Sequence, residues 1–139
     1  SELWKALNDA QAIDFVKQKG KGLEFPIEAG GKNLSGGQRQ RIAIARGLLR
    51  NTKITVFDDS FSALDYETDA KLREALNSYT DMTKIIISQR VATLYRCDKI
   101  LVLDNGNAVG FDTHENLCDS CLVYREICHS QQFGKEGAL

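Results

Sequence analysis

The stretch KITVFDDSFSALD, residues 53–65, decides the fold, because an apolar run ends there in two adjacent carboxylates. Residues 54–57 are β-branched or aromatic and show no clean alternation with polar positions, which is typical of a strand buried on both faces. In open α/β sheets, ligands bind outside the carboxyl ends of the parallel strands. Asp58 and Asp59 are therefore expected at a ligand-binding edge of a sheet.

The segments on either side of this stretch predict alternating helices and strands. Residues 3–18 carry apolar side chains at helical spacing and predict one or two helices. Ser35 is expected to cap a following helix, and Asp65 another, because both residue types accept hydrogen bonds from a free helix N-terminus. The run KIIIS at residues 84–88 predicts a second buried strand.

Toward the C-terminus, the dipeptide Asn105-Gly106 predicts a β-hairpin, and Thr113 is expected to cap a last helical region that ends near residue 130. Residues 131–139 are expected to be loose. Strands that alternate with helices predict an α/β fold with a partly parallel sheet, in a single domain without an internal repeat.

The composition excludes several classes of protein. The 139 residues are 42% hydrophobic and 27% charged, with a net charge of −1, so no global field favours nucleic acid or a membrane surface. The apolar runs are too short for a transmembrane helix, and no signal peptide is visible. The four cysteines are expected to be free thiols in a reducing compartment.

The stretch LSGGQ, residues 34–38, combines features that are typical of an anion-binding site. Its glycines let the backbone approach a ligand closely, Ser35 and Gln38 supply hydrogen bonds, and the following helix directs its N-terminal N–H groups toward the same place. Phosphate is the most natural ligand. The same five residues also fit a plain loop and helix cap, since short motifs often match by chance.

Each of the two carboxylates suits a different task at a phosphate site. Asp58 suits a Mg²⁺ ion held through water beside a nucleotide. Asp59 is expected to face the attacking water of a phosphoryl transfer. The alternative, that one of them only caps the following turn, fits Asp59 alone better than it fits the pair.

Four motifs in this order and spacing resemble the nucleotide-binding domain of ATP-binding cassette (ABC) transporters. LSGGQ resembles the signature motif, residues 54–58 the Walker B strand, and Ser62, Ala63, Leu64 and Asp65 the D-loop. Gln89 falls at the position of the switch histidine, and residues 100–117 resemble the end of exporter-type domains of the multidrug or peptide kind. The signature residues are Leu34, Ser35, Gly36, Gly37 and Gln38.

The resemblance implies a partial P-loop NTPase domain. Residues 1–51 would be a helical subdomain with the signature motif, residues 52–130 the Walker B, D-loop and switch half of the core, and residues 131–139 a tail. The Walker A pattern is expected upstream of Ser1, because its nearest imitation, PIEAGGKN, ends in Asn33 instead of Ser or Thr.

Two residues depart from what the family usually has at its hydrolytic site. Asp59 stands where glutamate is usual and is one methylene shorter, and Gln89 is always neutral where a histidine can carry charge. The intact signature beside this weakened site resembles the degenerate subunit of a heterodimeric exporter. A homodimer in which Asp59 still works slowly is the alternative.

The resemblance further implies ATP and Mg²⁺ as cofactors and two partners: a second ABC ATPase domain, packed head to tail, and a transmembrane domain. The expected place is the cytoplasmic face of the membrane, and no nucleic-acid partner is expected. The rival functions are a soluble ABC-type ATPase that acts on DNA or ribosomes, and an interaction module without catalysis.

A zinc site is the alternative interpretation of Cys118 and Cys121, with Cys128 and His129 nearby. Packing in the core is preferred, because Cys121, Tyr124 and Cys128 share one helical face. His114, just inside the helix that Thr113 caps, is expected at the surface.

Overall fold

The computed structural model describes residues 1–134 and 137–138, and these fall into two compact units, Ser1–Ile87 and Ser88–Leu139. The expectation of a single domain stays a prediction. In the described part of the chain, no helix has the length and apolar character that a membrane crossing requires.

Unit 1 begins with a helical half. Helices α1 (Glu2–Asp9) and α2 (Ile13–Gln18) confirm the helical prediction for the N-terminus. Two short 3₁₀ turns, η1 (Gly22–Glu24) and η2 (Ala29–Gly31), lead to the long helix α3 (Gly36–Leu49). Ser35 caps α3 as predicted, and Gln38 completes a capping box with it.

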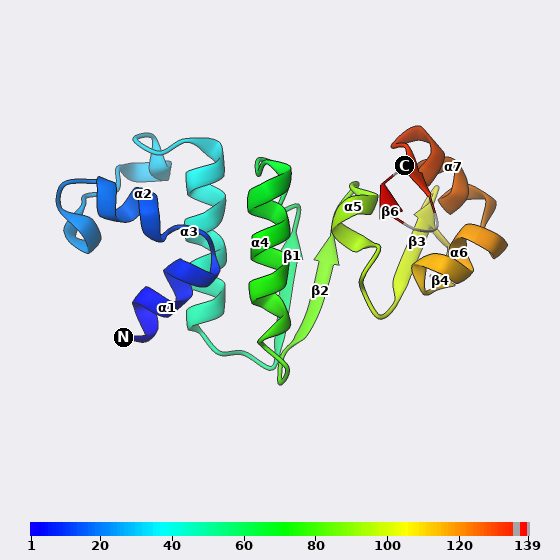
Figure 1. Ribbon diagram of the computed structural model, residues 1–139, viewed down its shortest axis with the longest axis horizontal. Helices are drawn as coiled ribbons and strands as arrows, with labels where there is room; N and C mark the ends of the chain where they lie inside the picture. The colour runs from blue at the N-terminus through cyan, green and yellow to red at the C-terminus, as the bar shows by residue number, and fades with distance from the viewer. Residues whose placement is uncertain (135–136, 139) are drawn as a thin grey trace. The chain divides into compact units, whose positions relative to one another are not determined.

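The second half of unit 1 is a parallel β-α-β arrangement. Strand β1 (Ile54–Asp58) pairs in parallel with β2 (Thr83–Ile87), and helix α4 (Tyr66–Asn77) connects them (Figure 1). The register places Asp58 opposite Ile87, so both strands end at the same edge. This arrangement confirms the predicted partly parallel sheet and the cap at Asp65.

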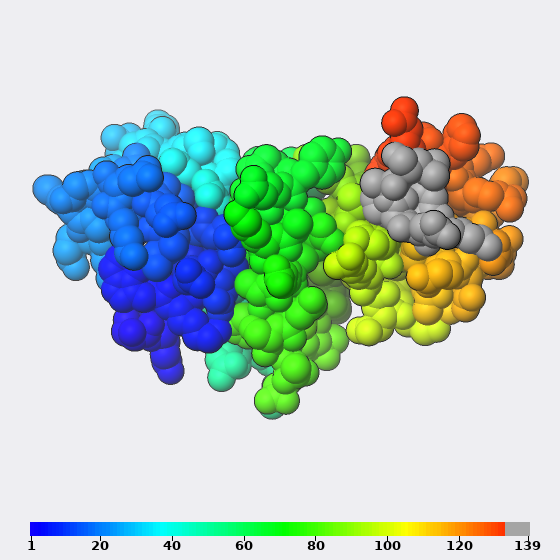
Figure 2. All heavy atoms as spheres, in the orientation of Figure 1, coloured from blue at the N-terminus to red at the C-terminus, as the bar shows by residue number. Residues whose placement is uncertain are grey.

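The core of unit 1 lies between the strands and the helices. Leu72 on α4, Phe57 on β1 and Phe61 in the loop after β1 are almost completely buried in one cluster with residues of α1 and α3. Helices α1 and α4 are far apart in the sequence, yet they lie against each other in the space-filling view (Figure 2). The hydroxyl of Tyr79, just after α4, donates to Asp9 of α1 at 2.7 Å and fastens this contact.

The prediction that both strands are buried on both faces is wrong for this chain. Their second face is exposed: Ile54 is 62% exposed and Val56 56%, and Ile85 and Ile87 on β2 are also open. Phe57 is buried because it points toward α4 and α3. Apolar side chains on both faces of a strand show that both faces are suited to packing in a core. Within the described residues, only the face toward the helices is covered.

Unit 2 contains the predicted hairpin. After the short helix α5 (Val91–Leu94), strand β3 (Ile100–Asp104) pairs antiparallel with β4 (Asn107–Asp112). Asn105 and Gly106 have φ angles of +46° and +78°, the left-handed conformation that an Asn-Gly turn adopts. The pairing shifts between Val102 and Leu103, which is a β-bulge.

Two helices pack on this hairpin and complete unit 2. Helix α6 (His114–Ser120) begins at the predicted cap Thr113, and α7 (Leu122–Ser130) follows it directly. A Cβ atom at Gly110 of β4 would lie 2.8 Å from the Leu117 side chain, so glycine allows α6 to approach the strand. The tail, expected to be loose, lies partly outside the described residues; its described part contains the short pair β5 (Phe133–Gly134) and β6 (Gly137–Ala138).

The core of unit 2 contains the cysteine-rich helical face. Cys118, Cys121 and Cys128 are buried in one cluster with Leu117 and Tyr124, as the packing interpretation predicts. The prediction of a surface position for His114 is wrong, because its side chain is 1% exposed. The first residue of this capped helix faces inward because its ring packs against Tyr95, which follows α5, and Tyr124 of α7.

The buried face of α4 should dominate the stability of unit 1. We expect Leu72→Ala to lower the free energy of unfolding by about 2–5 kcal/mol, because it removes a fully buried side chain and leaves a cavity. The matched control is Leu49→Ala, whose side chain is 42% exposed and whose cost should be about 1 kcal/mol or less. Urea unfolding followed by circular dichroism measures both, and equal losses would contradict this placement of the core.

Candidate functional site

The N-terminus of α3 presents hydrogen-bond donors in a fixed arrangement. The backbone N–H of Gln38 donates to Ser35 Oγ at 3.2 Å, and the N–H of Ser35 donates to Gln38 Oε1 at 3.1 Å. In these two bonds the side-chain oxygens of Ser35 and Gln38 act as acceptors. The Ser35 hydroxyl and the Gln38 amide group can therefore still donate hydrogen bonds to a ligand. Ser35 is exposed, and the dipole of the helix favours an anion at this end.

The two glycines of this helix start lie against the loop that follows β1. A Cβ atom at Gly37 would stand 3.0 Å from the backbone oxygen of Ala63, and one at Gly36 would stand 3.7 Å from the Ala63 Cβ. The sequence suggested that these glycines let a ligand approach. The structure adds a second reason for the glycine at position 37, because α3 and the loop after β1 touch there.

The acid pair stands at the carboxyl end of β1, as predicted. Asp58 is the last residue of the strand and Asp59 is the first of the loop, and both are exposed. Asp59 has a φ of +47°, and its N–H still donates to the Ile87 carbonyl at 3.0 Å. Left-handed backbone is more tolerable for aspartate than for most residues. The chain therefore turns sharply at Asp59 while this residue remains tied to β2.

Gln40, which the sequence analysis did not select, joins the two parts of the site. Its amide nitrogen lies 3.2 Å from the Asp59 carbonyl and 3.0 Å from Ser62 Oγ, and its amide oxygen accepts the Ala63 N–H at 2.9 Å. One side chain of α3 thus makes hydrogen bonds both to the start of the loop after β1, at Asp59, and to its later residues Ser62 and Ala63. A signal was present in the sequence: Gln40 lies one helical turn after Gly36 and shares its face.

The residues of the D-loop pattern divide into core and surface positions. Leu64 is buried, as is Leu34 of the LSGGQ stretch, so these two contribute packing. Ser62, Ala63 and Asp65 are exposed. Asp65 accepts the Thr68 N–H at 2.9 Å and the Thr68 hydroxyl at 2.8 Å, and the backbone hydrogen bond holds the pKa of its carboxyl below the usual value.

Two arginines after the LSGGQ stretch hold loops in place. Arg41 donates to the Gln11 carbonyl at 2.7 Å, and its guanidinium lies 4.9 Å from the Phe15 ring. Arg39 donates to the Leu34 carbonyl at 3.0 Å. These contacts anchor α3 to the preceding helices.

Gln89 belongs to unit 2, and its side chain is exposed. Its carbonyl accepts a hydrogen bond from the Gln131 amide at 2.7 Å, and the same amide group of Gln131 accepts the Val91 N–H at 2.9 Å. These bonds fix the backbone before α5. The role of Gln89 at a switch position stays a prediction.

Comparisons with known proteins agree with this geometry. A family model described as ABC transporter matches residues 3–62. An uncharacterized ABC transporter ATP-binding protein of Mycobacterium tuberculosis strain H37Rv is 47% identical over 131 residues, which are 94% of this chain and 22% of that protein. An ATP-dependent lipid A-core flippase of Photobacterium profundum is 41% identical over 135 residues, 96% of this chain and 23% of the flippase.

A solved structure shows the same fold. A bacterial Atm1-family ABC exporter with ATP bound superposes with a TM-score of 0.90 at 33% identity, over 96% of this chain and 24% of the exporter chain. The chain spans less than a quarter of the length of each of these three proteins.

The Gln40 bridge can be tested in the chain itself. We expect Gln40→Met, which keeps the volume but loses the donors and the acceptor, to speed hydrogen exchange of the Ala63 amide by about fivefold, since one hydrogen bond contributes about 1 kcal/mol. The Thr68 amide, held by Asp65, serves as the internal control and should keep its exchange rate. Unchanged exchange at Ala63 would show that the bridge does not hold the loop.

Proposed function

We propose that this chain is the C-terminal part of a nucleotide-binding domain of the ABC transporter family and that it forms part of two ATP sites in an exporter. In the whole protein, ATP binding and hydrolysis would drive transport across a membrane. The observation that carries this proposal is that one compact unit holds both an anion-binding helix start and a strand-end acid pair, joined through Gln40.

The first site uses the exposed start of α3. Ser35, Gly36, Gly37 and Gln38 would contact the phosphates of an ATP molecule that a second ABC ATPase domain holds, in a head-to-tail pair. Support comes from the donor groups that the capping box leaves available and from the exposure of Ser35. Ala63 of the D-loop residues lies against Gly36 and Gly37, so the exposed residues Ser62, Ala63 and Asp65 would belong to the same surface, while the buried Leu64 would support it from the core.

The second site uses the end of β1. The exposed carboxylate of Asp58 fits Mg²⁺, which prefers oxygen ligands and keeps several waters, and we assign Asp58 to hold the ion through water. The ion would neutralise charge on the phosphates. Asp59 would orient the attacking water. Gln89, whose amide is always neutral, would occupy the switch position. The cofactors of the proposed function are thus ATP and Mg²⁺.

We propose that this second site is slow. The Asp59 carboxylate stands about 1.5 Å nearer the backbone than a glutamate carboxylate would. Displacing a catalytic group by about 1 Å can cost on the order of a hundredfold in rate. The signature residues carry no such departure, so the chain would complete an efficient site on its partner and hold ATP at its own. This asymmetry is that of one half of a heterodimeric exporter.

The exposed apolar face of β1 and β2 supports the assignment to a larger domain. Ile54, Val56, Ile85 and Ile87 would be covered by the rest of the ATPase domain, including the Walker A segment. Residues 1–51 would then be the helical subdomain and residues 52–130 half of the core. The assembled protein would place this segment at the cytoplasmic face of the membrane, beside a transmembrane domain.

The division of labour between the two sites predicts unequal mutant effects in the assembled transporter. Ser35→Arg should reduce ATP turnover at least about tenfold more than Asp59→Asn, because it blocks the efficient site. Asp59→Glu should raise turnover, since it restores the longer carboxylate. Steady-state ATPase assays of the three variants against the unaltered transporter measure this. Equal losses from Ser35→Arg and Asp59→Asn, with no gain from Asp59→Glu, would contradict a slow own site.

The chain of residues 1–139 should itself bind nucleotide weakly, because PIEAGGKN does not match the phosphate-cradling pattern. Calorimetric titration with MgATP is expected to show no saturable binding below about 1 mM. A dissociation constant in the micromolar range would refute the assignment of the main phosphate contacts to another segment.

A further inference from the structure

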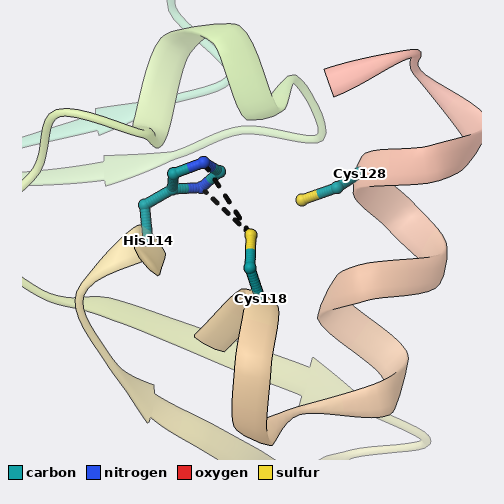
Figure 3. A group of neighbouring side chains, drawn as sticks. All are labelled: His114, Cys118 and Cys128. Carbon is teal, nitrogen blue, oxygen red and sulfur yellow. Dashed lines mark hydrogen bonds between the residues drawn. The ribbon is translucent and has the colours of Figure 1, made fainter. Parts of the chain in front are cut away.

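Unit 2 brings together three soft metal ligands that the proposed ATPase function does not use. His114 and Cys118 are one turn apart on α6, and Cys128 reaches the same point from α7 (Figure 3). Their ligand atoms all lie within 4.8 Å of one another, and all three side chains are buried. We propose that this group, the HCC cluster, is a binding site for Zn²⁺.

The spacing of the HCC cluster is close to what tetrahedral zinc requires. Bonds of about 2.3 Å to sulfur and 2.0 Å to nitrogen place the ligand atoms of a tetrahedral site about 3.5–3.8 Å apart. The Sγ atom of Cys118 lies 3.8 Å from Nε2 of His114. Bringing the most widely separated ligand atoms to this spacing would take a shift of about 1 Å, which a rotation of the Cys128 side chain can supply.

His114 is held in the way that zinc-ligating histidines are held. Its Nδ1 lies 2.9 Å from the hydroxyl of Tyr124, a buried hydrogen bond. Metal-binding histidines pair the second ring nitrogen with an oxygen partner, which fixes the orientation and the tautomer of the ring. In the tautomer that suits a metal, Nδ1 carries the ring proton and donates it in this hydrogen bond to the hydroxyl oxygen of Tyr124. Nε2 then carries the lone pair that a metal needs.

Charge balance selects a divalent ion. Burying an uncompensated charge is expensive, and the HCC cluster lies in an apolar core with Leu117 and Val91. Two thiolates, one neutral imidazole and one Zn²⁺ ion sum to zero, whereas a monovalent ion would leave a net negative charge in the core. Each Zn²⁺ bound would displace the two thiol protons to solvent.

The chain offers a matched control for this site. Cys121 is buried in the same cluster of residues, between α6 and α7, but its Sγ atom points toward the Val109 carbonyl at 3.8 Å and is not part of the group. Replacing Cys121 removes a buried thiol without removing a proposed ligand. The site also differs from the pair Cys118 and Cys121 with His129 that the sequence suggested, because the fold selects His114 and leaves Cys121 outside.

The test is to titrate the reduced, metal-free chain with Co²⁺ alone, with helical circular dichroism confirming the fold. The unaltered chain and Cys121→Ser should develop the visible bands of tetrahedral cobalt bound to thiolate, at one equivalent, and Zn²⁺ should then abolish them. Cys118→Ser and Cys128→Ser should each lower the affinity at least about tenfold. A folded unaltered chain without these bands, or bands that both variants keep, would overturn the proposal.

A second measurement decides the case if either serine variant does not fold. X-ray absorption at the zinc edge of the unaltered, Zn²⁺-loaded chain should show two sulfur scatterers at about 2.3 Å and one imidazole nitrogen. A first shell of oxygen and nitrogen alone would overturn the proposal, since it would place the ion on the surface.

Discussion

The contact on which unit 1 depends is the amide of Gln40 between the start of α3 and the loop after β1. Its three hydrogen bonds reach Asp59, Ser62 and Ala63, while Gly37 allows the helix to touch the same loop. The start of α3 and the turn at Asp59 belong to different elements, and these hydrogen bonds hold the two next to each other.

The fold followed from the sequence wherever a local rule had no competitor. Ser35, Asp65 and Thr113 cap helices because their side chains accept from free N–H groups close by in the chain. Asn105-Gly106 turns the hairpin because both residues tolerate positive φ. The parallel pairing of β1 and β2 followed from the helix between them. The caps and the turn depend on interactions within a few residues, so they could be read from the sequence; the strand pairing could be read because a helix connects two consecutive strands.

The predictions failed where the outcome depended on tertiary neighbours. His114 was expected at the surface from its place at a helix start, but Tyr95 and Tyr124 pack against its ring and it is buried. The strands were expected to be covered on both faces, but within the described residues one face is open. Gln40 was not selected, because its place one helical turn after Gly36 does not reveal which residues of the loop after β1 it contacts. The motif residues of the site were found because their pattern resembles a family; the contacts that position them were not.

The central claim is that the two ATP sites of the assembled protein are unequal, with this chain completing the fast site and holding ATP at the slow one. A single-turnover experiment tests it most directly: the transporter is loaded with radiolabelled ATP and Mg²⁺, unbound nucleotide is removed, and the retained ATP and ADP are followed over time. We predict two phases of equal amplitude, one with rapid hydrolysis and one in which intact ATP persists. A single phase, in which all bound ATP is hydrolysed at one rate, would contradict the proposal that the two sites are unequal.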